Sequence, residues 1–140
     1  MWIFYAFLSS IFAAAVAILG KLGLKGIDST LATTVRSVIM AGFLVLTSAL
    51  LGKLSGISSG MFTGKQWALI AGSGIAGALS WLFYFFALQN GSAGAVSAID
   101  RMSLVFVILL AAIFLGESLT WKVGLGAALM AIGAILIVVK

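Results

Sequence analysis

The side chains that could do acid–base or metal chemistry in this chain are few. Its 140 residues include three acids, Asp28, Asp100 and Glu117, and no histidine or cysteine. Histidine is the commonest general base near neutral pH and the commonest metal ligand, and without cysteine there is neither a disulfide framework nor thiol chemistry. Three separated carboxylates are too little for a hydrolase or a metal centre. We therefore predict a protein that is not an enzyme, with no catalytic residue, no metal site and no cofactor.

Three charged residues stand out because they lie inside apolar stretches. Arg36 comes five residues after the start of one stretch, and Asp100 comes five residues after the start of another, with Arg101 beside it. If both stretches are helices entering a membrane from the same side, both groups lie ~7–8 Å below that interface, at ~1.5 Å per residue. Such charges are costly unless they are paired or hydrated. The pattern predicts an Arg36–Asp100 ion pair, which is either a structural brace or part of a substrate or ion path. Arg101 would then reach the headgroups or face a cavity.

A stripe of polar and aromatic residues follows one face of the stretch 67–88. Its members recur at intervals of three, four or seven residues and so share one side of a helix. They are Ser73, Gly77, Ser80, Trp81 and Tyr84. Small polar groups beside aromatic rings suit a pocket for an organic solute, although the same spacing also suits close packing between helices. Ser73, Ser80, Trp81 and Tyr84 join Arg36, Asp100 and Arg101 as candidates for binding a substrate or lining its path.

We expect these candidates to lie on helices in a lipid bilayer, because the chain is too apolar to fold as a soluble domain. Hydrophobic residues make up 64% of the sequence and charged residues 8%, more apolar surface than a soluble domain of this size can bury. A spanning helix needs ~20 apolar residues. Five stretches qualify: 2–20, 31–51, 67–88, 95–115 and 121–139. We predict an all-α integral membrane protein whose residues 1–140 form a single five-helix transmembrane domain.

The ends and faces of the predicted helices carry local signals. Candidate N-caps, whose side chains would satisfy backbone donors that lipid leaves unpaired, precede two of the helices: Asp28, Ser29 and Thr30 before the second, and Ser118 and Thr120 before the fifth. The fifth helix carries a stripe of small residues, which indicates a packing surface. The stripe consists of Gly124, Ala127, Ala128, Ala131 and Ala134.

The basic residues are scattered singly and give a net charge of +5. Binding of nucleic acid needs a basic face, so we expect no nucleic-acid partner. Five spans place the two termini on opposite sides of the membrane, with three lysines on each side. These are Lys53, Lys65 and Lys122 on the N-terminal side, and Lys21, Lys25 and Lys140 on the other. Counting Arg36 and Arg101 tips the positive-inside rule slightly towards a cytoplasmic C-terminus. A near tie is also typical of a chain that inserts in both directions.

Three segments in the second half of the chain carry a resemblance to a known family. They are Ala-Ile-Asp-Arg-Met-Ser-Leu-Val-Phe at 98–106, Phe-Leu-Gly-Glu-Ser-Leu-Thr at 114–120 and Gly-Leu-Gly-Ala-Ala-Leu-Met-Ala-Ile-Gly-Ala at 124–134. With the embedded Arg36 upstream, they resemble the EamA domain, the repeat unit of the drug/metabolite transporter superfamily. The resemblance covers essentially the whole chain and is closest to short, single-repeat members. Such domains often carry a proline near the start of the fourth helix, and this chain has no proline.

The resemblance implies a membrane transporter of a small organic metabolite in a prokaryotic cytoplasmic (inner) membrane. Full-length relatives have ten helices in two halves of inverted topology, an arrangement that an odd number of spans produces on duplication. A single-repeat chain would recover it as an antiparallel homodimer and would work by alternating access between two inverted protomers. Because Asp100 would be held ionised by arginine, it would be a poor proton carrier, which favours facilitated diffusion or exchange. The alternative is a non-transporting scaffold or accessory subunit of a larger membrane complex.

Overall fold

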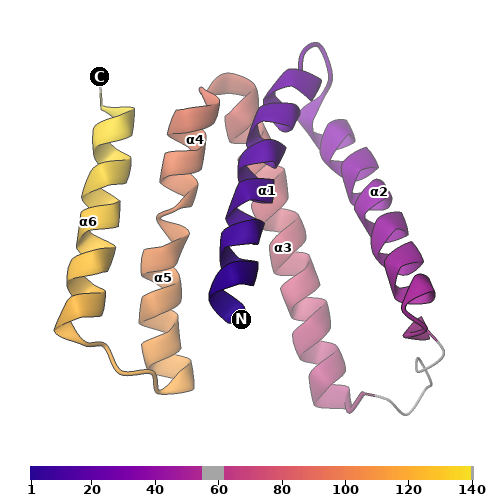
Figure 1. Cartoon of the computed structure of the whole chain (residues 1–140). Coiled ribbons are helices and arrows are strands. Elements are labelled where there is room, and N and C mark those ends of the chain that lie inside the picture. Colours follow the sequence, from indigo (N-terminus) through magenta and orange to yellow (C-terminus); the bar gives the residue numbers. More distant parts are fainter. Residues whose placement is uncertain (55–61, 140) are drawn as a thin grey trace. The chain divides into compact units, whose positions relative to one another are not determined.

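The computed structural model describes residues 1–54 and 62–139, and within these ranges every regular element is a helix. Five helical segments are long and apolar enough to cross a membrane (Figure 1). They are Trp2–Gly23, Ser29–Leu50, Gly64–Asn90, Ala93–Leu115 and Trp121–Val138. The predicted class, an all-α integral membrane protein with five spans, is confirmed. Lys140, which entered the charge balance, lies outside the described residues.

The second, third and fourth spans begin two or three residues earlier than the apolar stretches suggested, because polar residues cap their first turns. Helix α2 (Ser29–Leu50) starts after Asp28, whose carboxylate accepts a hydrogen bond from the Leu31 N–H at 2.9 Å. At the start of helix α3 (Gly64–Asn90), the Thr63 N–H donates to Gln66 Oε1 at 2.8 Å, and the Gln66 N–H donates to Thr63 Oγ1 at 3.3 Å. This reciprocal pair is a capping box. Caps satisfy donors that lipid cannot, so the helices run on into polar sequence.

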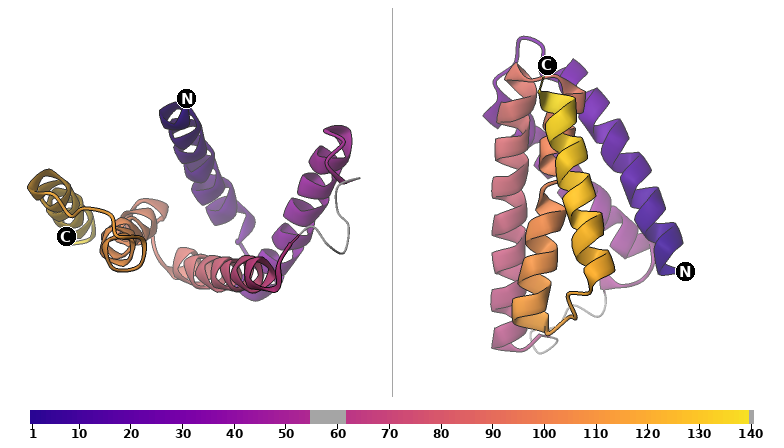
Figure 2. Two further views of the ribbon diagram at one scale, coloured as in Figure 1. Left: turned by 90° about the horizontal axis from the view of Figure 1, so that it is seen from below. Right: turned by 90° about the vertical axis from the view of Figure 1, so that its left-hand side faces the viewer.

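The chain divides into two compact units, Met1–Lys21 with Asn90–Lys140, and Leu22–Gln89. In the first unit, helix α6 (Trp121–Val138) packs against α4 (Ala93–Asp100) and α5 (Ser103–Leu110), as both views of Figure 2 show. Ala98 of α4 is buried, as are Ala127 and Ala134 of α6. Small side chains let helix backbones approach closely, which agrees with the predicted packing role of the α6 stripe. Lys21, near the end of helix α1 (Trp2–Gly23), donates to the Gly91 carbonyl before α4 at 2.8 Å.

The fourth span ends at a left-handed glycine. After α5 the chain forms a π-helical turn, η2 (Ala111–Leu115), and Gly116 follows with φ +69°. Its N–H and that of Glu117 both reach back to the Ala111 carbonyl. A residue with a Cβ adopts this conformation only at a cost. The Leu-Gly-Glu element of the sequence therefore marks a helix stop, and Thr120 then caps α6 by accepting from the Val123 N–H at 3.4 Å.

The second unit is built from α2 and α3. The start of α2 is linked to the end of α3 by a hydrogen bond from Gln89 Nε2 to the Ile27 carbonyl, at 3.3 Å. Ser29, Thr33, Phe85 and Leu88 are buried. One turn after Thr33, the Arg36 side chain of α2 reaches the Trp81 and Phe85 rings of the third span.

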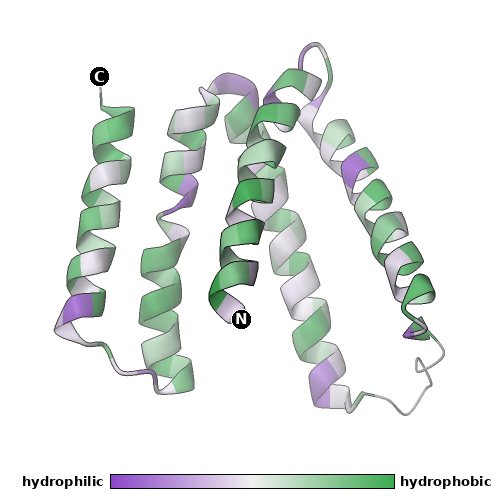
Figure 3. Cartoon of the chain, in the orientation of Figure 1, coloured by the Kyte–Doolittle hydropathy of each residue, from purple (hydrophilic) through white to green (hydrophobic). Residues whose placement is uncertain are grey.

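Most large apolar side chains of the described residues are exposed. In the most apolar window of each span, no more than 6% of the residues are buried. Figure 3 shows hydrophobic residues along every helix, with hydrophilic ones inside α2 and at the junction of α4 and α5. Apolar surface of this extent is stable in lipid and costly in water, as expected of membrane-spanning helices.

Candidate functional site

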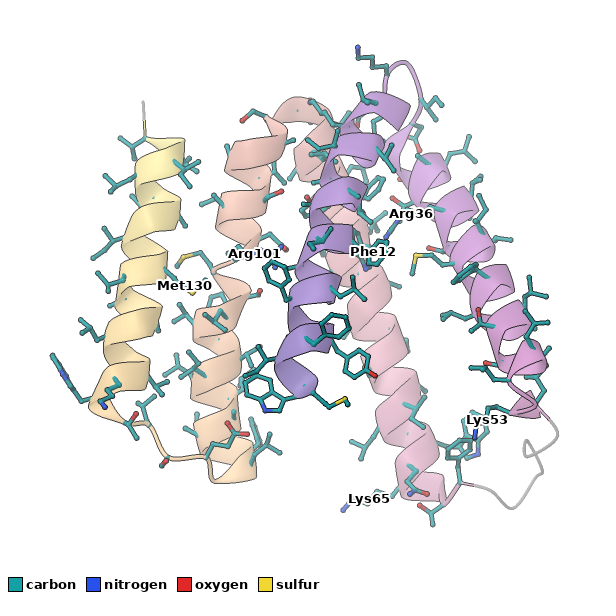
Figure 4. The ribbon with its side chains drawn as sticks, in the orientation of Figure 1. Phe12, Arg36, Lys53, Lys65, Arg101 and Met130 are labelled. Carbon is teal, nitrogen blue, oxygen red and sulfur yellow. The ribbon has the colours of Figure 1, made fainter. Side chains whose placement is uncertain are left out.

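Arg36 lies over the indole ring of Trp81. Its guanidinium carbon, Cζ, is 3.8 Å from the centroid of the Trp81 ring and 5.2 Å from that of Phe85. Both distances lie within the ~6 Å over which an aromatic face attracts a cation. Figure 4 shows the Arg36 side chain extending from α2 towards α3. The embedded positive charge therefore has aromatic partners within its own unit.

Three aromatic rings on α3 form this partner surface, which we call the aromatic cluster: Trp81, Tyr84 and Phe85. The ring centroids of Trp81 and Tyr84 are 5.5 Å apart at 76°, and those of Trp81 and Phe85 are 6.1 Å apart at 64°. Residues spaced by three and four lie on one helix face, and the edge-to-face geometry is a favourable one for rings. Phe85 was not among the predicted site residues, although its spacing of four from Trp81 indicates the same face.

The predicted stripe on α3 is only partly gathered at Arg36. The structure brings Trp81 and Tyr84 of the stripe to the aromatic cluster. Ser73 lies eight residues earlier, which is ~12 Å along the helix axis, and both Ser73 and Ser80 are exposed. The two serines stay predicted path residues. The aromatic residues are the part of the stripe that lies beside the Arg36 charge.

Hydroxyl groups around Arg36 bond to their own helix. Thr33 Oγ1 donates to the Ser29 carbonyl at 2.7 Å, and Ser37 Oγ donates to the Thr33 carbonyl at 2.8 Å. Such bonds to the preceding turn satisfy the hydroxyl proton inside an apolar environment. The polar face of α2 is thus internally bonded next to Arg36, and the guanidinium is its one charged group.

The other two predicted charges lie where the fourth span is interrupted. The sequence predicted one span over 95–115, and the structure has one from Ala93 to Leu115, interrupted for two residues between α4, which ends at Asp100, and α5, which begins at Ser103. The Met102 N–H donates to the Ile99 carbonyl, and the Leu104 N–H donates to the Arg101 carbonyl. These bonds span three residues instead of four, which tightens the chain into a 3₁₀-like turn.

The interruption leaves one backbone carbonyl of the fourth span without its helical hydrogen bond. Because Leu104 donates to Arg101, the Asp100 carbonyl does not receive the bond that an α-helix would give it. Irregular backbone is tolerated within a membrane only where protein buries it or water reaches it. The chain contains no proline, so this break does not depend on the missing N–H of a proline ring.

Asp100 and Arg101 are both exposed at the break. In Figure 4 the Arg101 side chain lies on the side of the fourth span away from α6, whereas Met130 of α6 lies on the side that faces this span. Arg36 belongs to the other unit, so the ion pair between Arg36 and Asp100 stays a prediction.

Metal binding has no obvious place among these residues. In the ranges 1–54 and 62–139, no three histidine, cysteine, aspartate or glutamate side chains gather closely enough to hold a metal ion. The arrangement has two charged places. In one, the Arg36 cation lies on aromatic rings; in the other, the fourth span has a 3₁₀-like turn beside a carboxylate and a guanidinium.

Comparison with known proteins agrees with the transmembrane plan. Residues 1–139 match the EamA-like transporter family. A protein of a Sinorhizobium species, named "Uncharacterized transporter in cobO 3'region", is 38% identical over 138 residues, covering 99% of this chain and 96% of that protein. No solved structure matches the chain. The family and this relative point to a transporter that is not an enzyme, and they favour transport over a scaffold role. With five apolar spans and a match along almost its whole length, the chain is a membrane transporter that belongs to the EamA-like transporter family.

Proposed function

We propose that this chain carries a small organic metabolite across a prokaryotic cytoplasmic membrane, by alternating access between two inverted protomers. The observation that supports the proposal most is the match of one five-helix unit to the transporter family along residues 1–139. The Sinorhizobium relative has about the same length, since the match covers 96% of it. A single repeat is thus the extent that both proteins share.

An odd number of spans supports an antiparallel homodimer. Two copies inserted in opposite directions form the ten-helix, inverted-repeat plan on which many transporters alternate access around a midplane site. The balanced lysines fit such dual insertion, because the positive-inside rule then assigns no preferred direction. In this assembly residues 1–140 of each protomer are one domain, and the substrate path runs between the two.

The residues that line the path in this proposal come from both units. Arg36 with Trp81 and Tyr84 supplies a positive, aromatic surface, and Asp100 with Arg101 supplies charges at a break in the helix backbone. Ser73 and Ser80 extend the lining along α3. Charged groups and opened backbone are expensive in lipid and become stable where a hydrated path reaches them, which is why we assign these positions to the path.

Transport by this mechanism needs no proton carrier. The first span contains no acidic residue, and Asp100 is the one acid within any span. An Asp100 carboxylate that pairs with an arginine in part of the cycle is committed to that ion pair and is poorly placed to carry a proton. We therefore propose facilitated diffusion or exchange of the substrate.

Reconstitution of the chain alone tests the proposed function. Proteoliposomes that contain only this chain should exchange a labelled metabolite from a defined mixture faster than protein-free liposomes. Flux that appears only when another membrane protein is added would refute transport by the homodimer and favour an accessory role. A matched preparation of the W67F variant, changed at the far end of α3 from the aromatic cluster, should keep the wild-type flux.

A further inference from the structure

The contact between Arg36 and Trp81 leaves one part of the guanidinium without a partner. The Trp81 ring covers a face of the planar group at 3.8 Å, and Phe85 lies 5.2 Å away. The five N–H bonds of arginine point outward in the plane of the group, at its edges. An aromatic face attracts the charge, but it offers these N–H groups no oxygen acceptor. The Trp81 ring therefore stabilises the charge of Arg36 but gives its N–H groups no hydrogen-bond acceptor.

Arg36 makes no hydrogen bond to the described residues of its own unit. Among the described residues of Leu22–Gln89, none accepts a hydrogen bond from Arg36, and the one acid of this unit is Asp28. The Asp28 carboxylate accepts from the Leu31 N–H at the start of α2. It lies eight residues before Arg36, ~12 Å along the helix axis. The guanidinium thus lies against the Trp81 ring, while the N–H groups at its edge make no hydrogen bond to the described residues of this unit.

A guanidinium edge selects its ligand by shape. Its parallel N–H bonds match the two oxygens of a carboxylate or a phosphate, and such pairs combine charge with geometry. Stacking on Trp81 restrains the plane of the group, so that binding an anion costs less side-chain freedom. A lysine in the same place would supply a point charge without the fork.

We propose that the open edge of Arg36 binds the carboxylate or phosphate group of the transported solute, with Trp81 as the surface that orients the guanidinium. The inference rests on the proposed transport function and gives its substrate class as an organic anion. The same oxygen chemistry has two other sources, the phosphate of a lipid headgroup and the carboxylate of Asp100. The experiment must therefore separate all three.

The first arm measures binding without transport. The substitutions W2F, W67F and W121F leave Trp81 as the one tryptophan, and the variant is solubilised in a maltoside detergent, which contains no phosphate. Benzoate, phenyl phosphate and the neutral benzamide are then titrated while Trp81 fluorescence is recorded. We expect saturable changes with the two anions and not with benzamide. R36K should weaken anion binding by about 10- to 100-fold, the range that loss of charged hydrogen bonds gives, whereas K65Q on the same helix as Trp81 should leave it unchanged.

The other two sources are tested in the same system. If a lipid headgroup occupies the edge, Trp81 fluorescence will respond to added phosphatidylglycerol and not to soluble anions, which would overturn the assignment. If Asp100 occupies it, soluble anions will bind only in the D100N variant, and the assignment to substrate is again wrong. Equal binding of benzamide, or unchanged anion binding in R36K, would also overturn it.

The second arm measures what is transported. Proteoliposomes are offered an equimolar mixture of carboxylates, phosphate monoesters, amines and neutral sugars, and their contents are identified by mass spectrometry. We expect the enriched solutes to carry a carboxylate or phosphate, and R36K to reduce their uptake by about 10-fold or more. Enrichment of amines or neutral sugars would contradict the anion assignment while transport stands. Anion binding without any uptake would contradict transport while the anion site stands, and failure of both arms would refute both.

Discussion

Replacing Trp81 by leucine should destabilise the α2–α3 unit, and a defined part of the loss should depend on Arg36. Trp81 contacts two rings edge-to-face, with centroids 5.5 and 6.1 Å away, and each such pair contributes about 0.5–1.5 kcal/mol. The Arg36 contact at 3.8 Å adds about 1–2 kcal/mol, between the values for exposed and desolvated cation–π pairs. The expected total loss for W81L is about 2–5 kcal/mol.

A double-mutant cycle isolates the Arg36 share of that loss. R36M keeps a long flexible side chain and removes the charge. It forfeits the cation–π contact but also relieves a cost of about 2.5–3.5 kcal/mol for a charge within a span, so R36M alone should be neutral or slightly stabilising. In the R36M background, W81L should cost about 1–2 kcal/mol less than in the wild type.

Unfolding in mixed micelles of dodecyl sulfate, followed by circular dichroism, gives the four free energies of the cycle. The matched control pairs R36M with W67L, since Trp67 also makes an edge-to-face contact, with Phe62 at 5.3 Å, but lies fourteen residues before Trp81. That control cycle should be additive within about 0.5 kcal/mol. A coupling between Arg36 and Trp81 as small as the control value would refute the argument that the rings stabilise the embedded charge.

Three further predictions concern local structure and coupling. G116A should destabilise the fourth span by about 1–2 kcal/mol, because a Cβ at φ +69° is strained, although open space surrounds the position; an unchanged unfolding midpoint would argue against the helix-stop role. D28A should cost about 1 kcal/mol through loss of the α2 cap, and D28S should restore most of it in the same unfolding assay. Metabolite flux in proteoliposomes should not respond to an imposed pH gradient of either sign; a response that disappears in D100N would show that Asp100 carries protons.

The five spans could be predicted from the sequence because lipid sets a simple requirement of length and apolarity. Their ends could not be placed as well, because a helix ends where its backbone is capped, not where hydropathy falls. Asp28 and Thr120 were among the candidate caps, and the structure shows that each of them caps its helix. The Thr63–Gln66 capping box lies in polar sequence that the hydropathy pattern excluded, which is why α3 starts three residues earlier than predicted.

The partner of Arg36 shows what sequence spacing leaves out. Depth in the membrane indicated that the charge needs a partner, and a carboxylate was the expected one. Within the same unit the structure places Trp81 and Phe85 beside it, a contact that sequence spacing does not reveal because it joins two helices; the pair with Asp100 stays a prediction. The break after Asp100 was also missed, since it arises from backbone hydrogen bonds that no proline signals.

The measurement that tests the inverted-dimer account most directly is the orientation of the C-terminus in the membrane. One reporter active only in the cytoplasm and one active only outside are fused in turn after Lys140, and their activities are normalised to the amount of protein. The account predicts comparable activity of both reporters, because half of the chains insert in each direction. Activity of one reporter alone would contradict an antiparallel homodimer of this chain and would require an oppositely oriented partner protein.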